Sequence, residues 1–305
     1  MVLEIKYINF DDNIKETQAI ACLGFFDGLH IAHQKLIKKG QELKNITGKK
    51  LLVFTFDQSI SKYLSNQPFY YLTSIEDKKS ILENFDVDVL YVFRVSKQLI
   101  SMEPDEFINQ FLIKMDYLVV GFDFTYGFRS LGDVSHLIKF NEFKTIIIPE
   151  LTYESEKIGS TKIRYALDSG NLELVRYLLD RNYQIKGKVI KGKGIGKALG
   201  FPTANIDYTN YYLPKIGVYL TKIYLDDKMY YGVTNIGKRP TFRDSLISLE
   251  TYIFDLDANL YDKYITIEFV KYMRKEIKYA NKNLLIKQIK KDVVQAKKII
   301  KRGIL

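Results

Sequence analysis

The pattern of apolar segments changes near Tyr183, and this change most limits the folds open to the chain. Before it, short apolar runs alternate with helix-like segments; after it, β-rich runs follow one another through turns. The alternation predicts a parallel sheet with crossover helices, whereas strands without helices predict an antiparallel sandwich or a small barrel. The 305 residues suffice for two such domains, which we place at 1–183 and 184–305.

The expected elements follow this division. In the first half we expect strands over 19–25, 51–56, 87–92, 117–120 and 145–148, and helices over 33–43, 104–114, 160–167 and 171–180, with another helix opening at Ser74. In the second half we expect strands over 187–190, 217–224, 229–235, 248–256 and 264–272. Apolar residues spaced four, four, three and four apart, from Leu285 to Ile300, predict a final helix over 283–302.

Composition excludes several classes of protein. Hydrophobic residues make up 47% and charged residues 27% of the chain, which is a globular and not a disordered balance. No apolar run approaches the roughly 18 to 20 residues of a membrane span. The first residues do not read as a secretory signal, and the single cysteine, Cys22, fits a reducing compartment. We therefore expect a soluble, cytoplasmic protein with no membrane partner.

The charge is unevenly divided between the halves. Residues 1–183 carry 22 basic and 25 acidic side chains, whereas residues 184–305 carry 24 basic and 11 acidic ones. The second half thus has a net charge of +13, which attracts polyanions, either nucleic acid or small phosphorylated molecules. Seven of its basic residues lie on the predicted final helix, where a solvated face is the simpler interpretation.

Two of the three histidines fall together, in Gly24-Phe-Phe-Asp-Gly-Leu-His30-Ile-Ala-His33. The segment lies between a predicted buried strand and a predicted helix, where α/β sheets hold phosphates over a helix N-terminus. Two imidazoles three residues apart on a first turn point to the same side and could stabilise negative charge on a phosphate. A polar turn without chemistry and a zinc pair are the alternatives, although no third or fourth soft ligand lies nearby.

Two further segments of the first half carry groups suited to a nucleotide. Residues 160–164 (Ser-Thr-Lys-Ile-Arg) start a predicted helix whose free N–H groups can bind anions, although a well-capped helix without function is equally consistent. Residues 121–133 (Gly-Phe-Asp-Phe-Thr-Tyr-Gly-Phe-Arg-Ser-Leu-Gly-Asp) follow a predicted strand and contain three glycines among aromatic residues. Their glycines suit a planar ring pressed on the backbone, and an ordinary glycine loop is the alternative. All three segments are expected at the carboxyl ends of the parallel strands.

The second half contains a glycine-rich segment, GKVIKGKGIGKALGFPTANI, over residues 187–206. The loop 192–197 predicts phosphate binding by backbone N–H groups. It is not a Walker A loop, because Lys191 stands where the first glycine belongs and Ala198 replaces the metal-binding Ser or Thr. Thr203 and Asn205 lie two apart, so on a strand both face the same side, and their oxygens are hard ligands that suit Mg²⁺.

Glu250 is an acidic residue in a strand otherwise rich in apolar and aromatic side chains. Such surroundings can raise the pKa of a carboxyl group and suit it to act as a general base. The alternative is a glutamate that faces solvent on an amphipathic strand.

The three segments of the first half together resemble the nucleotidyltransferase family with the His-x-Gly-His and Ser-x-x-x-Arg signatures. The Gly-x-Asp-Phe loop at 121–124 narrows the resemblance to the adenylyltransferase module of bacterial FAD synthetases. Ala32 stands where the family has a glycine, and Gly159 where it usually has a first serine. The strand end at 55–57 also lacks the Pro-His-Pro that commonly follows.

The second half resembles the riboflavin kinase family. Its landmarks, in the expected order, are LGFPTAN at 199–205, GVY at 217–219, NIGKRPTF at 235–242, LE at 249–250, DLDANLY at 255–261 and MRKE at 273–276. Lys197 replaces the family's usual arginine, a change that keeps the charge and loses the bidentate fork. Nearly the whole chain therefore resembles the bifunctional riboflavin kinase/FMN adenylyltransferase (FAD synthetase) family.

The resemblance implies a Rossmann-like nucleotidyltransferase domain followed by a mainly antiparallel β-barrel kinase domain with a C-terminal helix. It implies ATP-dependent phosphorylation of riboflavin to FMN and adenylylation of FMN to FAD, with Mg²⁺ held by Thr203 and Asn205. The implied catalytic residues are Glu250, as the kinase base, and His30 and His33, in the adenylyltransferase half. The implied ATP- and phosphate-binding residues are Gly24, Asp27, Asp123, Ser160, Thr161, Arg164, Gly192, Lys193, Gly194, Gly196 and Lys197, and the implied flavin-binding residues are Arg274 and Glu276.

Two alternatives to this function stay open at the level of sequence. One half of the chain could be inactive, and the departures at Ala32 and Gly159 would make the adenylyltransferase the half that is lost. An RNA-binding protein could use the basic half and some of the 23 tyrosines, although these are scattered and no RNP or KH signature is present. We expect small-molecule substrates and no nucleic-acid partner; the sequence leaves the oligomeric state open.

Overall fold

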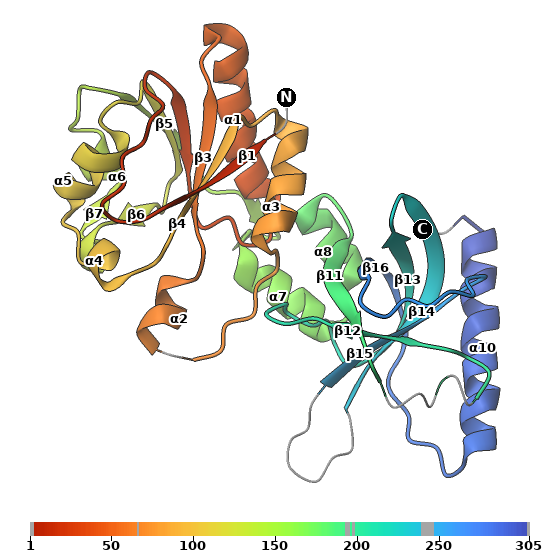
Figure 1. Cartoon of the computed structure of the whole chain (residues 1–305). Coiled ribbons are helices and arrows are strands. Elements are labelled where there is room, and N and C mark those ends of the chain that lie inside the picture. The colour runs from red at the N-terminus through yellow and green to blue at the C-terminus, as the bar shows by residue number, and fades with distance from the viewer. Residues whose placement is uncertain (1–2, 66, 193–195, 197–198, 239–246, 304–305) are drawn as a thin grey trace. The chain divides into compact units, whose positions relative to one another are not determined.

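The computed structural model describes residues 3–65, 67–192, 196, 199–238 and 247–303. The chain forms two compact units, Met1–Ser160 and Thr161–Leu305, which Figure 1 shows in red to yellow and in green to blue. Among the described residues, no helix is both long and apolar enough to cross a membrane.

The first unit is built on a six-stranded parallel sheet with the order β1-β4-β3-β2-β5-β8 (Figure 1). The strands are β1 (Glu4–Ile8), β2 (Ile20–Leu23), β3 (Leu51–Phe56), β4 (Val89–Phe93), β5 (Tyr117–Gly121) and β8 (Lys144–Ile148). Five of them match the expected strands. The edge strand β1 was not expected, because it is short and carries two charged side chains among partly exposed positions.

Helices connect the strands, as the alternating pattern predicts. They are α1 (Ile31–Thr47), α2 (Ile60–Ser65), α3 (Ile75–Leu82), α4 (Lys97–Ile100), α5 (Pro104–Phe107) and α6 (Val134–Leu137). The expected helix over 104–114 is α5 continued by a π-helix, Ile108–Leu112. Ser74 is the N-cap of α3 and forms a capping box with Asp77. Two short hairpins, β6 (Thr125–Tyr126) with β7 (Gly132–Asp133) and β9 (Thr152–Tyr153) with β10 (Glu156–Lys157), complete the unit.

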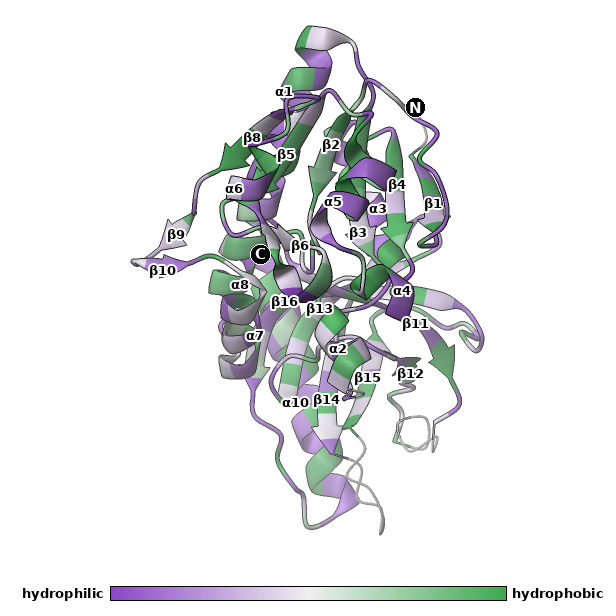
Figure 2. Ribbon diagram, turned by 90° about the vertical axis from the view of Figure 1, so that its left-hand side faces the viewer, coloured by the Kyte–Doolittle hydropathy of each residue, from purple (hydrophilic) through white to green (hydrophobic). Residues whose placement is uncertain are grey.

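Apolar side chains cover both faces of this sheet, and its strands are mostly green in Figure 2. One cluster includes Phe54 and Phe93 with Phe107 from α5, and the other includes Val53 and Leu36 from α1. Alternate residues of one strand thus serve opposite faces, as the pleat requires. Burial on both faces explains why β2, β3 and β4 read as continuous apolar runs.

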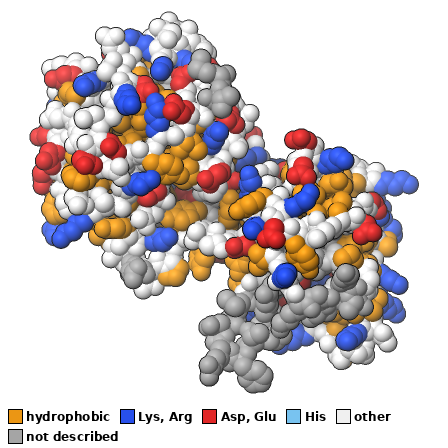
Figure 3. Space-filling model, viewed as in Figure 1, with side chains coloured by type: hydrophobic (Ala, Val, Ile, Leu, Met, Phe, Trp, Pro, Cys, Tyr) orange, Lys and Arg blue, Asp and Glu red, His pale blue; other side chains and the backbone are white. Residues whose placement is uncertain are grey.

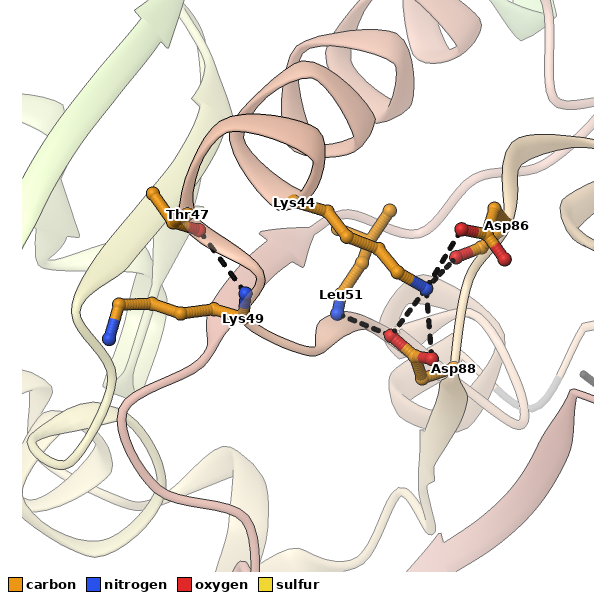
Figure 4. A network of polar contacts seen from close by, with 6 residues as sticks. All are labelled: Lys44, Thr47, Lys49, Leu51, Asp86 and Asp88. Carbon is orange, nitrogen blue, oxygen red and sulfur yellow. Dashed lines mark hydrogen bonds and ion pairs between the residues drawn. The ribbon is translucent and has the colours of Figure 1, made fainter.

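Charged side chains tie the elements together at the amino ends of the strands (Figure 4). Lys44, near the end of α1, places its Nζ 2.9 Å from Oδ2 of Asp88 and 3.0 Å from Oδ2 of Asp86. The N–H of Leu51, at the start of β3, donates to Asp88 at 2.7 Å. The pKa of Lys44 is raised because the hydrogen bonds and charges of these carboxylates outweigh its partial burial. This cluster therefore fixes α1 to the starts of β3 and β4.

The second unit is a closed six-stranded barrel, all antiparallel, with the order β11-β12-β15-β14-β13-β16. Its elements are α7 (Ser160–Ser169), α8 (Leu172–Leu179), β11 (Tyr183–Ile190), β12 (Ala204–Asp207), β13 (Gly217–Leu225), β14 (Lys228–Lys238), β15 (Ile247–Ile253), β16 (Tyr264–Arg274) and α10 (Lys282–Lys301). Of the two architectures that the sequence left open, the barrel is the one that forms. Asn171 is the N-cap of α8, as expected, and the change from helices to strands falls at Tyr183.

Alternation along the strands decides which residues face the barrel interior. The fully buried Thr221, Thr234 and Thr251 lie on β13, β14 and β15, and their hydroxyls hydrogen-bond in a row, at 2.8 and 2.9 Å. Their chain neighbours therefore point to the outer face. Part of that face is covered by α10, whose buried Ala296 belongs to a cluster with Leu220 and Phe254. Lys and Arg side chains line the edge of the unit where Figure 1 places α10 (Figure 3), which fits the solvated-face interpretation.

Candidate active sites

The first candidate site lies at the carboxyl ends of the parallel strands. The order of strands reverses between β2 and β5, the position where open α/β sheets bind ligands. A cavity of about 870 Å³ opens there, lined from the strand ends and their loops, and the lining includes Gly24, His33 and Asp123. Hydrophobic side chains are exposed on the face of this unit shown in Figure 3. The cavity is large enough for a nucleotide-sized ligand.

His30 and His33 occupy the start of α1, as the sequence predicts. His30 is 4% exposed and is the N-cap, and its Nδ1 accepts a bond from the His33 N–H at 3.4 Å. The two imidazole rings stack with centroids 3.6 Å apart, and the rings of His33 and Phe26 are T-shaped with centroids 5.2 Å apart. The pair therefore sits over the positive end of a 17-residue helix, where anions are favoured.

The pKa of His33 lies well below its ordinary value. Burial is the largest cause, and the charges of His30, Lys78 and Lys157 act in the same direction. Its Nδ1 is buried and has no hydrogen-bond partner. His33 is thus a neutral imidazole at physiological pH, with one N–H to donate.

The turn between β2 and α1 is held by buried polar groups. Asp27 is 2% exposed, and its carboxylate accepts the N–H of Leu72 at 2.8 Å. The carbonyl of Asp27 accepts the hydroxyl of Ser160 at 2.9 Å. Ser160, which is far from this turn in the sequence, thus contacts the turn before the histidines. The Asp27 carboxylate is engaged with the backbone of the segment before α3.

Lys78 is a residue of this region that the sequence analysis missed. It is 2% exposed, and its ammonium donates to the Phe25 carbonyl at 2.7 Å and to Oγ1 of Thr55 at 3.1 Å. A signal was present: Lys78 lies three residues after Ile75 and four before Leu82, on the apolar stripe of α3. Lysine is rarely fully buried in proteins, so a lysine on the buried face of a helix indicates a special role.

The loop after β5 contributes the Asp123 side of the cavity. The Asp123 carboxylate is exposed and pairs with the ammonium of Lys157, which lies over the Phe122 ring. Gly127 has φ +74°, and a Cβ there would lie 2.9 Å from Pro104. Glycine is therefore required at the point where this loop turns.

Thr161 and Arg164 follow Ser160 on α7 and belong to the second unit. Thr161 is exposed, and the Arg164 guanidinium lies 5.5 Å from the centre of the Tyr212 ring. Gly159, just before the helix, has open space where a Cβ would be. A serine at this position would therefore be tolerated sterically.

The second candidate site lies on the outer face of the barrel. Glu250, on β15, is directly opposite Asn205 of β12 on one side and Asn235 of β14 on the other. Residues opposite one another on antiparallel strands point to the same face, with Cβ atoms about 4.5–5.5 Å apart. The three side chains thus form one polar row across three strands. The sequence predicted two members of this row and missed Asn235, because only the strand register brings it beside Glu250.

Two glycines of the glycine-rich segment, Gly192 and Gly196, lie close to the predicted metal ligands. A Cβ on Gly192 would lie 2.1 Å from Nδ2 of Asn205, and a Cβ on Gly196 would lie 2.8 Å from Oγ1 of Thr203. Thr203 immediately precedes β12, and Asn205 is 6% exposed within it. Close approach to these side chains explains glycine at both positions. The predicted residues Lys193, Gly194 and Lys197 lie outside the described part of the chain.

Glu276 lies beside the polar row, whereas Arg274 is bound to the terminal helix. A Cβ on Gly237 would meet Glu276 Oε1 at 2.3 Å and Asn235 Nδ2 at 2.8 Å. The Arg274 guanidinium makes a two-bond pair with Asp292 of α10, at 2.9 and 2.6 Å. The pKa of Arg274 is raised, since its bond to Asp292 outweighs burial. This pair ties β16 to α10, an arrangement that the sequence analysis did not foresee.

The donor set of the second site suits magnesium. No group of three or more His, Cys, Asp or Glu side chains that could hold a metal ion occurs among the described residues. Mg²⁺ is commonly held by few protein oxygens together with water and substrate phosphates. The hydroxyl of Thr203 and the amide oxygen of Asn205, beside a glycine loop, fit such a site.

Comparisons with known proteins find a family for each half of the chain. The FAD synthetase family model matches residues 12–162, and the riboflavin kinase family model matches residues 179–300. The bifunctional riboflavin kinase/FMN adenylyltransferase of Listeria monocytogenes is 36% identical over 92% of each chain, and that of Bacillus subtilis is 38% identical over 93% of each. The solved structure of a macrolide-efflux protein from Streptococcus pneumoniae superimposes with a TM-score of 0.86, at 26% identity over 96% of this chain and 98% of that one. The chain belongs to the bifunctional riboflavin kinase/FMN adenylyltransferase family.

Proposed function

We propose that each half of the chain carries one ATP-using site, so that the protein phosphorylates riboflavin to FMN and then adenylylates FMN to FAD. Both family models match, one over residues 12–162 and the other over residues 179–300, and this favours two activities over one or over RNA binding. We keep 1–183 and 184–305 as the division between the two functions.

At the barrel, Glu250 accepts the proton of the riboflavin 5′-hydroxyl while that oxygen attacks the γ-phosphate of ATP. Thr203 and Asn205 would hold Mg²⁺ together with the ATP phosphates, and the ion would neutralise charge on them. The Gly192–Gly196 loop binds these phosphates through backbone N–H groups, and Arg274 and Glu276 serve the flavin side. The observation that supports this assignment is the row Asn205, Glu250 and Asn235 on three adjacent strands.

At the parallel sheet, a phosphate oxygen of FMN attacks the α-phosphate of a second ATP, and pyrophosphate leaves. His30 and His33 donate hydrogen bonds to the phosphate oxygens as charge develops. Gly24 and Asp123 line the cavity that receives the nucleotide, Asp27 shapes the turn, and Ser160, Thr161 and Arg164 hold the departing phosphates. The stacked histidine pair at the start of α1 carries this assignment.

One assay tests the whole proposal. Purified protein is incubated with riboflavin, ATP and Mg²⁺, and FMN and FAD are followed separately by chromatography. We expect FMN to appear first and FAD to accumulate from it, and no product of either kind when Mg²⁺ is chelated. Formation of FMN without FAD would reduce the protein to a kinase with a non-catalytic nucleotidyltransferase unit.

The proposal extends to partners and location. The substrates are small molecules, and the basic surface of α10 is assigned to solvent and not to nucleic acid. A cytoplasmic location is supported by the single, buried Cys22. Retention of oligonucleotides that depends strongly on salt concentration would contradict this part.

A further inference from the structure

A buried ammonium group lies beneath the adenylyltransferase site. Nζ of Lys78 donates to the Phe25 carbonyl and to Thr55 Oγ1, and it lies 4.8 Å from the centre of the Phe25 ring. The Thr55 hydroxyl donates to the same carbonyl at 2.8 Å. Lys78 therefore sits where the turn after β2 and the end of β3 meet.

Keeping a charge in this place is costly. The groups that Lys78 contacts are neutral oxygens, and burial of an ammonium group without a closely paired anion is strongly unfavourable. The carboxylate of Asp27 raises the pKa of Lys78, but burial outweighs it and lowers the pKa to about 8. A charge retained against such a cost is typical of functional sites.

The turn that Lys78 holds is strained. Phe26 and Leu29 have φ values of 53° and 43°, in the left-handed region that bulky residues avoid. Three contacts from α3 and the segment before it hold this turn. The Leu72 N–H donates to the Asp27 carboxylate, the Gly28 N–H donates to the Thr73 hydroxyl at 3.0 Å, and Lys78, within α3, donates to the Phe25 carbonyl. The turn ends at His30, so its conformation sets where the two imidazoles lie.

We propose that Lys78 is a positioning residue for adenylyl transfer: its ammonium fixes the turn that carries His30 and His33, and it adds positive charge beneath the phosphate-binding end of α1. Lys78 does not line the cavity, whereas Phe25 and His33 do. It acts through them. The inference rests on the proposed adenylyltransferase function.

Two matched variants separate this role from a structural one. Lys78→Met removes the charge and keeps the length of the side chain; Lys44→Met does the same at the opposite end of the sheet. For Lys78→Met we expect kcat for FMN adenylylation to fall about 100-fold. Riboflavin kinase activity should stay within about twofold, and Tm should be unchanged or higher, because a buried charge is lost and Thr55 still bonds the Phe25 carbonyl. For Lys44→Met we expect a lower Tm and both activities within about twofold.

The pH dependence of the unmodified protein is a second test, which needs no variant to fold. FAD formation from FMN should decline above about pH 8, since the ammonium is present only below its pKa, while kinase activity on the same chain should not decline there. The titratable groups facing Lys78 are Asp27 of the turn and His33 of α1. The pKa of His33 lies well below its ordinary value, so this imidazole does not produce an alkaline decline. Lys78→Arg should move the decline to higher pH, because a guanidinium stays charged.

The outcomes are distinguishable from failure of the proposed function. If the unmodified protein makes no FAD from FMN, the adenylyltransferase assignment itself fails. If it does, a flat profile to about pH 9.5, or a Lys78→Met enzyme with normal kcat, overturns the role of Lys78. A Lys78→Met enzyme that loses Tm and both activities together would make Lys78 a purely structural residue.

Discussion

The two candidate sites handle phosphate in different ways. The site on the parallel sheet presents hydrogen-bond donors and positive charge: two stacked imidazoles at a helix N-terminus, with the buried Lys78 beneath. The site on the barrel presents oxygens, in the row Asn205, Glu250 and Asn235 with Thr203 nearby. The first can act on a phosphate directly, whereas the second suits a cation that binds the phosphate and a base that removes a proton.

This difference follows from the architecture beneath each site. A parallel sheet with crossover helices directs helix N-termini to one edge, so donors converge there without help from side-chain charge. The strands of an antiparallel barrel do not direct helix N-termini to one edge, so selectivity at Glu250 comes from side chains in register across strands. Variants at the two sites should therefore affect one activity each, and in different manners.

Glu250→Gln should have the largest effect. The amide cannot accept the hydroxyl proton, so FMN formation should fall by about 10²–10⁴-fold. FMN adenylylation should persist, because the residues assigned to it lie on the parallel-sheet unit and on α7, and none lies on the barrel strands. The two rates are measured separately, with riboflavin and with FMN as the starting flavin. Equal loss of both would break the comparison of two independent sites.

His33→Ala tests the other side and should have the next largest effect. Removing one donor aimed at a reacting phosphate typically costs about 10²–10³-fold in kcat. FAD formation should fall accordingly, with riboflavin kinase activity retained. His136, the third histidine, offers a matched control, because it lies on α6 and hydrogen-bonds to Tyr126 of β6. His136→Ala should leave FAD formation closer to normal. A His33→Ala enzyme as active as the His136→Ala enzyme would remove the histidine pair from the mechanism.

Sequence spacing predicted the parts of each site that are local in the chain. The histidine pair at the start of α1, the cap at Ser74 and the residues Thr203 and Asn205 all depend on neighbours within a few positions. Lys78 and Asn235 were missed because their roles arise from contacts with distant segments, Phe25 in one case and Glu250 in the other. Arg274 shows the same limit, since only the fold reveals that Asp292 holds its guanidinium.

Asn205→Ala tests whether the barrel site binds phosphate through a cation held by side-chain oxygens, unlike the site on the parallel sheet. Losing one oxygen interaction of about 1–3 kcal/mol should raise the Mg²⁺ concentration needed for half-maximal kinase activity by about 5- to 150-fold. The Mg²⁺ dependence of FAD formation, measured with FMN as substrate, should not move. Thr203→Ala should act in the same direction. Unchanged Mg²⁺ dependence in both variants would show that the pair packs the glycine loop and does not bind the ion.

Ala32→Gly should have the smallest effect, and it tests how closely the donor site must match its relatives. Ala32 lies between the two histidines, where the resembling family has glycine, and an added methyl could crowd the α-phosphate. Yet the His30 cap bond and the stacked imidazole pair both form with alanine in place. We therefore expect the rate of FAD formation to change by less than about threefold, with a loss of stability of up to about 1 kcal/mol from the lower helix propensity of glycine. Rates at saturating FMN and thermal melts measure the two effects. A rise well beyond threefold would mean that the Ala32 methyl group crowds the substrate, and that it slows FAD formation in the unmodified protein.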